Sequence, residues 1–283
     1  ISDAKIVILD EPSSALTHSE RDLLYRIVNK IKAKGAGIFY ITHCIEDVSL
    51  LGDRVTVLKN GSIIGTRNVA DCPQEEIIEM LSGRYIMNRY PKIMIKKGKN
   101  ILSVRNFGFS DKLKNINLDL AEGDILGITG LAGSGRTLLA NCLFGAVDGV
   151  VGELYLNGSK IKLDSPYKAI SNGIALIPEN RLTDSLFGYM DISNNVAVTS
   201  LKRFANYSFI NTSYMEQVVA DYVEKLNIPQ HLHNNIMEYT GGNQQKAVFA
   251  KWIMSRAKIF ILDEPTRGLD IASKIDIYTS IND

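Results

Sequence analysis

The feature of this chain that most directly suggests chemistry is a pair of adjacent carboxylates that occurs twice. The run Ile-Leu-Asp-Glu-Pro contains Asp10 and Glu11 near the start of the chain, and it returns with Asp263 and Glu264 near the end. In each copy an apolar run precedes the acids, as expected of a buried strand whose end presents them to a ligand. An aspartate at that place is suited to hold Mg²⁺, and the following glutamate to orient or deprotonate an attacking water.

The repetition decides how these acidic pairs are interpreted. A single Asp-Glu after a strand would usually be a solvated turn, but two matching copies indicate a repeated fold. The copies lie roughly 250 residues apart, which is too long for a solenoid unit and fits two copies of a whole domain. The chain has 283 residues and is shorter than two such copies. We therefore expect a piece of a tandem protein, cut at both ends.

A glycine-rich segment between the two pairs fits a phosphate-binding loop. Residues 130–137 read Gly-Leu-Ala-Gly-Ser-Gly-Arg-Thr and follow the apolar run 124–129, which we expect to be a strand. Glycines let backbone N–H groups turn toward phosphate oxygens, and the next helix adds its positive end. Thr137 offers a hydroxyl to Mg²⁺. Arg136 stands where lysine is usual and brings a planar fork of donors in place of a compact ammonium. The expected phosphate-binding residues are Gly130, Gly133, Ser134, Gly135, Arg136, Thr137 and Leu138.

The surrounding pattern predicts the elements that position these groups. Continuous apolar runs at 4–9, 38–42 and 259–262 are typical of strands buried in a parallel sheet. The sequences Asn60-Gly61 and Asn157-Gly158 predict tight hairpin turns.

Helical spacing and composition outline the domains. Apolar residues recur at helical spacing in 23–31, in 75–81 and over most of 186–238. The lysine-rich stretch 91–100 interrupts this pattern, and we interpret it as a linker between domains. The predicted domains are therefore 1–95, the end of a first copy, and 96–283, a second copy truncated at its C-terminus.

Composition limits the classes of protein that fit. Apolar residues make up 45% of the chain and charged residues 22%, as in an ordinary globular protein. A net charge of +1 gives no sign of nucleic-acid binding. The three cysteines lack metal or redox spacing and are expected to be reduced thiols. No apolar run approaches the ~18–20 residues that cross a bilayer, so any membrane role needs a spanning partner.

The order of the motifs resembles the ATPase domain of ABC transporters, with a phosphate loop, a signature loop and then the Asp-Glu pair. That family's signature usually reads Leu-Ser-Gly-Gly-Gln, whereas residues 239–243 read Tyr-Thr-Gly-Gly-Asn. With Gly-Arg-Thr at 135–137 and Glu-Pro-Thr-Arg-Gly-Leu-Asp at 264–270, this variant resembles the second half of bacterial sugar-import ATPases. Those proteins drive the uptake of ribose, galactose, xylose or autoinducer-2. Residues 1–66 resemble the end of their first half.

The resemblance implies a fold and further site residues. The fold is α/β: a P-loop NTPase of the ABC type with a mostly parallel sheet, an antiparallel β subdomain and a helical subdomain, preceded by part of a first copy. His43 corresponds to the switch histidine near the γ-phosphate, Glu179 to a residue of the coupling loop, and Asp270 to the D-loop aspartate. The nucleotide-binding set then also includes Glu179, Thr240, Gly241, Gly242, Asn243 and Asp270. The implied catalytic residues are Glu11, His43 and Glu264, and the implied metal ligands are Asp10, Thr137 and Asp263.

The function implied by the resemblance is hydrolysis of ATP, with Mg²⁺, to drive import of a monosaccharide. Transmembrane permease subunits would be the partners and would connect the ATPase to a sugar-binding protein. The location would be peripheral, on the cytoplasmic face of the bacterial membrane, without nucleic acid. The resemblance implies nucleotide sites that each combine parts of two domains. The fragment alone would be inactive, because it lacks part of each site.

Two other classes remain as alternatives. A soluble ABC protein of translation or DNA repair would need a long coiled-coil insertion or a strongly basic region, and neither is present. A regulatory module that binds nucleotide without turnover is favoured mildly by Arg136 and opposed by the two Asp-Glu pairs.

Overall fold

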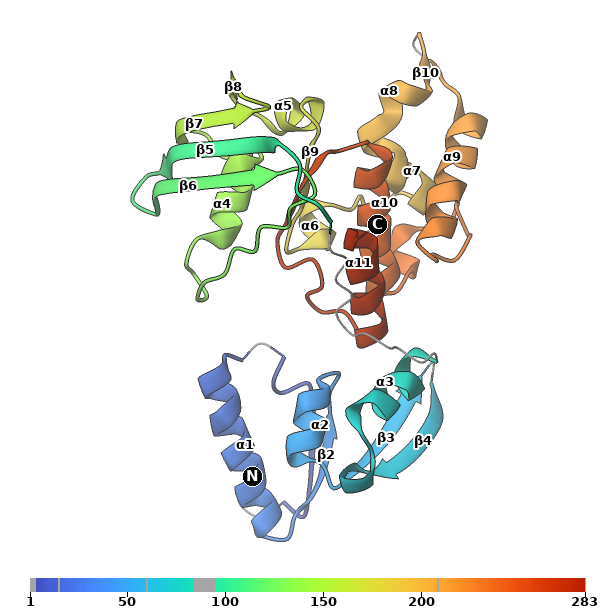
Figure 1. Cartoon of the computed structure of the whole chain (residues 1–283). Coiled ribbons are helices and arrows are strands. Elements are labelled where there is room, and N and C mark those ends of the chain that lie inside the picture. Colours follow the sequence, from blue (N-terminus) through green and yellow to red (C-terminus); the bar gives the residue numbers. More distant parts are fainter. Residues whose placement is uncertain (1–3, 15, 60, 84–94, 208, 283) are drawn as a thin grey trace. The chain divides into compact units, whose positions relative to one another are not determined.

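The computed structural model describes residues 4–14, 16–59, 61–83, 95–207 and 209–282. The chain divides into two compact units (Figure 1). The first unit comprises Ile1–Pro91 and Gly268–Thr279, and the second comprises Lys92–Arg267 and Ser280–Asp283. Residues 91–94 of the expected linker lie outside the described residues, and 95–99 form neither helix nor strand, as the linker interpretation predicts.

The first unit contains a pair of parallel strands with helices after each. Strands β1 (Ile6–Asp10) and β2 (Gly37–Ile41) pair in register, so that Asp10 lies opposite Ile41. Helix α1 (His18–Ala33) connects them, and α2 (Ile45–Leu51) follows β2. Both strands and the connecting helix were predicted from the sequence. Because parallel strands place their carboxyl ends at one edge, the two loops that leave these strands are neighbours.

A hairpin and two helices complete the first unit. Strands β3 (Arg54–Lys59) and β4 (Ser62–Asn68) are antiparallel. This agrees with the predicted hairpin, although Asn60 itself lies outside the described residues. A short 3-10 turn, η1 (Val69–Asp71), leads to α3 (Gln74–Ser82), which was also predicted. Helix α11 (Ile271–Asn282) contributes Ile271 and Ile275 to the same apolar core as the hairpin.

One face of the parallel pair in the first unit is uncovered. The exposed apolar side chains on this face are Ile6, Ile8, Phe39 and Ile41. Strands of parallel sheets are usually buried on both faces, and contiguous exposed apolar residues usually mark an interaction surface. This face is therefore a place where a further covering element would be stabilised.

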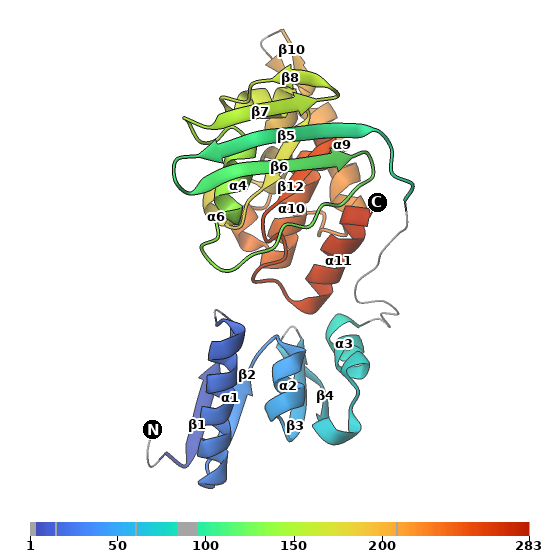
Figure 2. The same cartoon turned by 60° about the vertical axis from the view of Figure 1, so that its left-hand side comes forward.

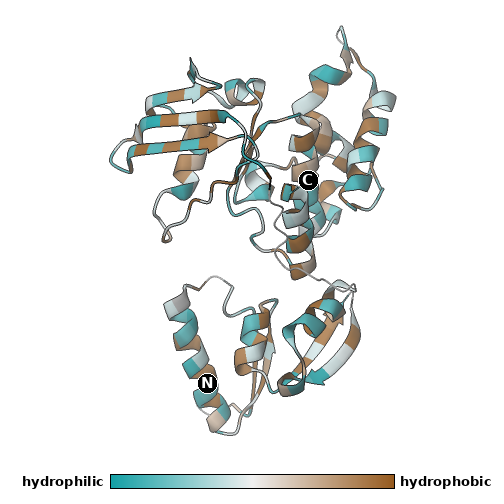
Figure 3. Cartoon of the chain, viewed as in Figure 1, coloured by the Kyte–Doolittle hydropathy of each residue, from teal (hydrophilic) through white to brown (hydrophobic). Residues whose placement is uncertain are grey.

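The second unit begins with a four-stranded antiparallel sheet in the order β6-β5-β7-β8 (Figure 2). Its strands are β5 (Asn100–Phe109), β6 (Leu113–Ala121), β7 (Val151–Leu156) and β8 (Ser159–Ile161). Hydrophobic and hydrophilic residues alternate along β5 and β6 (Figure 3). Asn157 and Gly158 both have left-handed backbone, with φ of 49° and 80°, as the predicted tight turn between β7 and β8 requires.

A second parallel pair lies deeper in this unit. Strand β9 (Ile174–Ile177) pairs in register with β12 (Ile259–Leu262), and the second of these agrees with the predicted strand 259–262. Helix α4 (Arg136–Leu143) follows the glycine-rich loop, and α5 (Pro166–Ser171) precedes β9. The β9–β12 pair therefore presents its carboxyl ends, and the residues that follow them, at one edge.

The predicted strand at 124–129 is wrong for this structure, because none of these residues is in a strand. Ile125 and Ile128 are exposed, and no described strand pairs with the segment. An apolar run becomes a strand only where a neighbour satisfies its N–H and C=O groups. Here the run continues as an irregular segment into the loop at 130–137.

The predicted helical stretch 186–238 is largely helical. It comprises α7 (Ile192–Ala197), η2 (Val198–Ser200), α8 (Leu201–Phe204), α9 (Thr212–Lys225) and η3 (Ile236–Glu238), with a small hairpin of β10 (Ala205–Asn206) and β11 (Phe209–Ile210). Short helix α6 (Arg181–Asp184) precedes it and α10 (Gly241–Met254) follows it. Apolar residues of α7, α9 and α10, such as Val196, Val219 and Val248, are completely buried.

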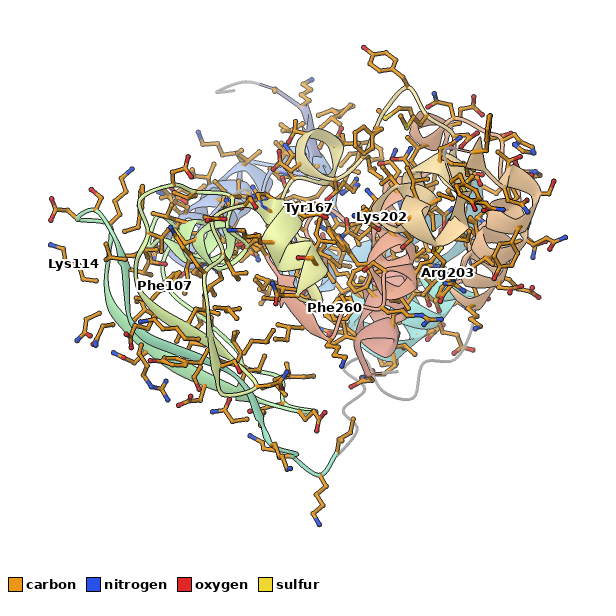
Figure 4. All side chains as sticks on the ribbon, turned by 90° about the horizontal axis from the view of Figure 1, so that it is seen from above. Phe107, Lys114, Tyr167, Lys202, Arg203 and Phe260 are labelled. Carbon is orange, nitrogen blue, oxygen red and sulfur yellow. The ribbon has the colours of Figure 1, made fainter. Side chains whose placement is uncertain are left out.

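A polar contact joins the helical part to α5 within the second unit. Lys202 of α8 donates a hydrogen bond from Nζ to the hydroxyl of Tyr167 over 3.0 Å, and both are labelled in Figure 4. Its Nζ also lies 5.1 Å from the centroid of that ring. Among the described residues, no helix has the length and apolar character needed to cross a membrane.

Candidate functional site

The glycine-rich loop of the second unit turns sharply into α4. Gly133 and Gly135 have φ of 78° and 93°, a left-handed backbone that favours glycine, and Gly135 directly precedes the helix. A Cβ on Gly130 would lie 2.6 Å from Oγ of Ser134, so this close approach also requires glycine. The helix begins at Arg136, and the first-turn N–H groups of such a helix are available to an anion.

Arg136 and Glu264 come together at this loop. Arg136 Nη2 lies 3.3 Å from Glu264 Oε1, and each side chain is about one third exposed (34% and 38%). A cavity of about 190 Å³ lies beside them in the second unit. Its lining residues are Ile128, Arg136, Leu139, Ala140, Leu143, Ile261, Leu262, Asp263 and Glu264. Arg136, at the end of the phosphate-type loop, and the second Asp-Glu pair are far apart in the sequence, yet they line one cavity.

Asp263 fits the role of a metal ligand at the end of β12. Its backbone N–H donates to the carbonyl of Ile177 over 2.9 Å, which fixes the end of the strand beside β9. The residue is only 9% exposed, and its Oδ2 has no hydrogen-bond partner. A buried carboxylate oxygen without a donor is stabilised by a cation.

Magnesium is compatible with this small set of protein ligands. The described residues hold no cluster of three His, Cys, Asp or Glu side chains that could form a protein-only metal cage. Mg²⁺ commonly takes one or two carboxylates and completes its shell with phosphate oxygens and water. Asp263 and the Thr137 hydroxyl would hold the ion, which would neutralise charge on bound phosphates.

Glu179 contacts the loop at Thr137 and also pairs with Arg267. It follows β9, and its Oε2 accepts a long hydrogen bond of 3.5 Å from Oγ1 of Thr137. Arg267 forms an ion pair with Glu179 and lies 4.0 Å from Glu264 Oε2. Residues that follow β9 and β12 thus contact the first residues of α4. Leu138, in the first turn of this helix, is half-buried.

The glycine-containing segment at 240–243 forms the first turn of α10. Thr240 is the N-cap, and its side chain accepts a hydrogen bond of 3.4 Å from the N–H of Asn243. Gly241 and Gly242 therefore open the helix, as predicted. No hydrogen bond or ion pair of the described residues connects 240–243 to the loop at 130–137. These two helix starts are separate features of the second unit.

The first unit brings Glu11 and His43 together. Nδ1 of His43 lies 3.1 Å from Oε1 of Glu11. Glu11 follows the end of β1, and His43 lies just beyond the neighbouring end of β2. Asp10 is the last residue of β1 and is exposed. This arrangement offers a carboxylate and an imidazole to a ligand at the same edge of the strand pair.

The two Asp-Glu pairs share an unusual backbone. Glu11 has φ of 44° and Glu264 has φ of 46°, a left-handed conformation that is uncommon for glutamate. In each copy the residue three positions later, Ser14 or Arg267, donates its backbone N–H to the glutamate carbonyl, over 3.3 and 3.0 Å. Strained backbone kept at equivalent positions is often part of a functional site.

Asp270 stands apart from these clusters. Its Oδ1 accepts a hydrogen bond of 2.9 Å from the N–H of Ser273, and its Oδ2 accepts one of 2.8 Å from the Ser273 hydroxyl. It therefore caps α11 in the first unit, whereas Thr17, at the N-cap of α1, donates its N–H and hydroxyl to Glu20. The contacts of Asp270 in this structure are those of an N-cap.

Sequence reasoning missed several residues of these sites. Arg267 lies within the motif at 264–270, whose pattern predicts no role for it, although it contacts both Glu179 and Glu264. Arg181 donates to Gln244 over 3.2 Å and ties α6 to the first turns of α10. Asp47 is completely buried beside the Glu11 loop. No local signal in the sequence indicates Asp47, because its partners Ser13, Tyr25 and Tyr40 come from other elements.

The chain belongs to the ABC transporter family, whose sequence model matches residues 113–267. The fold is that of an ATP-binding cassette, a P-loop NTPase. It is similar to MJ1267, an ATP-binding cassette of an ABC transporter, with TM-score 0.54 and 20% identity over 64% of this chain and 76% of that chain. It is also similar to the cassette MJ0796, in a dimeric post-hydrolysis state bound to ADP and Pi, with TM-score 0.54 and 19% identity over 64% of this chain and 81% of that chain.

Curated relatives narrow the similarity within this family. The ribose import ATP-binding protein RbsA of Clostridium tetani is 40% identical over 99% of this chain and 56% of its own length. The xylose import ATP-binding protein XylG of Thermoanaerobacter pseudethanolicus is 38% identical over 99% of this chain and 57% of its own. The galactose/methyl galactoside import ATP-binding protein MglA of Fusobacterium nucleatum is 36% identical over 97% and 56%. The chain thus spans somewhat more than half the length of these relatives.

Proposed function

We propose that this chain is part of an ATP-hydrolysing subunit that energises import of a monosaccharide through a separate membrane permease. The observation that carries the proposal is that Arg136, at the end of the phosphate-type loop, contacts Glu264 and lines one cavity with the second Asp-Glu pair. The loop supplies backbone donors for phosphates, Asp263 and Thr137 would hold Mg²⁺, and Glu264 would orient water. These are the components that phosphoryl transfer to water needs.

Two copies of the domain would account for the repeated Asp-Glu pair and its repeated backbone conformation. We assign residues 1–95 to the end of a first ATPase domain and 96–283 to part of a second. The matching φ angles of Glu11 and Glu264 support this assignment, and so does the greater length of the relatives. The uncovered apolar face of β1 and β2 is suited to packing by the remainder of the first domain.

Two nucleotide sites follow from two such domains. Asp10, Glu11 and His43 would belong to the site of the first domain, and the loop at 130–137 would act with Asp263 and Glu264 in the site of the second. Further nucleotide-binding residues are proposed to be Thr240, Gly241, Gly242, Asn243 and Asp270.

The substrate class is proposed from the relatives, which are ribose, xylose and galactose import ATP-binding proteins. The permease would deliver a monosaccharide of this kind, received from a sugar-binding protein. The ATPase would then lie on the cytoplasmic face of the bacterial membrane, held there by its partner.

An exposed apolar surface in the second unit is suited to the permease. Phe187, Met190 and Met237 are exposed. The segments that carry them are joined, since the N–H of Ile236 donates to the carbonyl of Met190 over 3.1 Å. This surface directly follows α6, close in sequence to Glu179, so that movement at the permease could reach the loop residues.

Reconstitution would test the proposal. The complete ATPase, with its permease in lipid vesicles, is expected to import labelled ribose, galactose or xylose only with MgATP present. Glu11→Gln should abolish most of this uptake, whereas Glu153→Gln on β7 should not. Uptake that is independent of ATP, or none of these sugars imported, would contradict the proposal.

A regulatory module that binds nucleotide without turnover is the second candidate. The ion pair between Arg136 and Glu264 favours it for the second site, because it engages the glutamate that would act on water. Steady-state hydrolysis by the complete protein separates the candidates, since a purely regulatory module would bind ATP and release no phosphate.

A further inference from the structure

Asp47 is a completely buried carboxylate in the first unit. It lies on the short helix α2 and has 0% exposure. A buried charge is costly unless hydrogen bonds or an opposite charge compensate it. The contacts around Asp47 therefore show what its burial maintains.

Four hydroxyl groups donate to this carboxylate. Tyr25 donates to Oδ1 over 2.5 Å, and Tyr40 and Thr42 donate to Oδ2 over 3.1 and 3.2 Å. Ser13 also donates to Oδ2. Burial alone would raise the pKa of Asp47, but the hydrogen bonds from Ser13, Tyr25 and Tyr40 outweigh it and the net direction is downward. The carboxylate is thus held in its ionised form by neutral donors.

Two of these donors belong to the loops that carry the candidate catalytic pair of the first unit. Ser13 is two residues after Glu11, and Thr42 directly precedes His43. The Thr42 hydroxyl also accepts the N–H of Cys44 over 2.9 Å, so residues on both sides of His43 are fixed. The left-handed turn at Glu11 lies in the other loop, with φ of 44°. One buried side chain therefore joins the loop after β1 to the loop after β2.

We propose that Asp47 is a positioning residue that holds Glu11 and His43 at their separation of 3.1 Å. The two tyrosines anchor the carboxylate to α1 and β2, and Ser13 and Thr42 transmit that position to the loops. The consequence for turnover rests on the proposed function, because it requires Glu11 and His43 to act on ATP. The geometric part stands on the contacts of the first unit alone.

Magnetic resonance of this 283-residue chain tests the geometric part. The ring ¹⁵N signal of His43 would be compared in the wild type, Glu11→Gln and Asp47→Asn, with Asp53→Asn as the control. Asp53 is an exposed carboxylate paired with Lys32 over 2.6 Å and lies outside the Asp47 cluster. Asp47→Asn is expected to move the signal at least half of the way to its position in Glu11→Gln. A signal that stays at the wild-type position would overturn the proposal.

Two milder variants guard against loss of the fold. Ser13→Ala and Thr42→Val each remove one donor and leave the buried carboxylate with three. Each is expected to give a partial shift of the His43 signal, whereas Thr42→Ser should restore the wild-type position because it keeps the hydroxyl. If Asp47→Asn unfolds the chain and both milder variants leave the signal unmoved, Asp47 has only a structural role and the proposal fails.

Turnover by the complete transporter tests the functional part. Asp47→Asn and Thr42→Val should lower kcat about tenfold or more, with KM for ATP changed less than about twofold, as expected when reacting groups are misplaced after binding. Equal changes in kcat and KM, or the same loss in Asp53→Asn, would contradict a positioning role. If the wild type itself hydrolyses no ATP, the proposed function fails, while the ¹⁵N result still decides the geometric inference.

Discussion

Arg136 and Glu264 face each other over 3.3 Å, although they belong to the phosphate-type loop and to the end of a distant strand. The guanidinium at the position where lysine is usual thus contacts the glutamate expected to orient water. Arginine offers a planar fork of donors suited to carboxylates, whereas a lysine would act as a mobile point charge. ATP binding at this site would have to redirect Arg136 from the carboxylate to phosphate.

This relationship predicts unequal roles for the two glutamates. General bases and water-positioning groups contribute about 10²–10⁴-fold to rate, so Glu11→Gln in the complete protein should lower turnover by about that range. Glu264→Gln should cost about tenfold or less, because Arg136 already engages this side chain. Single-site variants assayed with the permease measure the difference.

A matched variant examines the cause of that inequality. Arg136→Lys removes the guanidinium contact with Glu264 and keeps the positive charge, so adding Glu264→Gln to it should cost more than Glu264→Gln costs in the wild type. Equal losses from Glu11→Gln and Glu264→Gln in the wild type would mean that Arg136 supports full catalysis.

A second prediction concerns Glu179. Its contact with Thr137 is long, at 3.5 Å, so Glu179→Ala should change ATP affinity less than about threefold. Sugar uptake should fall about tenfold or more, because the loop after β9 would communicate with the permease. Equilibrium ATP binding and vesicle uptake would be measured together, with Glu153→Ala as the control. Parallel losses of binding and uptake would place Glu179 wholly within the nucleotide pocket.

The third prediction is that the 283-residue chain alone shows no appreciable ATPase turnover. The described part of the first unit pairs Glu11 with His43 but contains no phosphate-type loop, and the described part of the second unit pairs Glu264 with Arg136. Phosphate release by the purified chain would be compared with that of its Glu264→Gln variant. Robust release that Glu264→Gln abolishes would show that one site suffices.

The fourth prediction is a pH dependence at Asp119 of β6. Hydrogen bonds from Arg105, Ser103 and Asn100 lower the pKa of Asp119 from 3.8 to about 2. A lowered carboxyl pKa contributes stability that is complete above pH 3.8 and is lost as pH falls toward 2. Carboxyl ¹³C signals at about pH 3 should therefore show Asp119 mostly ionised, and Arg105→Met should make it more protonated. An unchanged signal in Arg105→Met would contradict the assigned cause.

Local pattern was sufficient where residues close in sequence decide the structure. The strand at 259–262, the turn at Asn157-Gly158 and the helix start at Gly241 appear where the sequence predicted them. The run 124–129 has the same apolar character, but a strand also needs a paired neighbour, and sequence pattern does not supply that information.

Long-range contacts explain the rest of the difference. The ion pair of Arg136 with Glu264 and the hydroxyl groups that donate to Asp47 join residues from several elements. Each residue alone has an ordinary surface interpretation, and only the packed fold brings the partners within hydrogen-bond range. The Glu11–His43 contact is easier to understand from the sequence, because both residues shortly follow the carboxyl ends of adjacent parallel strands.

The most direct test of the central claim, that residues 130–137 bind the phosphates of ATP, is MgATP binding by this chain and two matched glycine variants. Gly133 and Gly158 have φ of 78° and 80°, and a Cβ on either would meet nothing within 4 Å. Gly133→Ala and Gly158→Ala therefore carry the same backbone cost of about 1–2 kcal/mol, and only the first disturbs the loop. We predict that titration calorimetry will show binding to the wild type and Gly158→Ala, and binding at least about tenfold weaker to Gly133→Ala. Equal affinity of the two variants, or no binding to the wild type, would contradict the account.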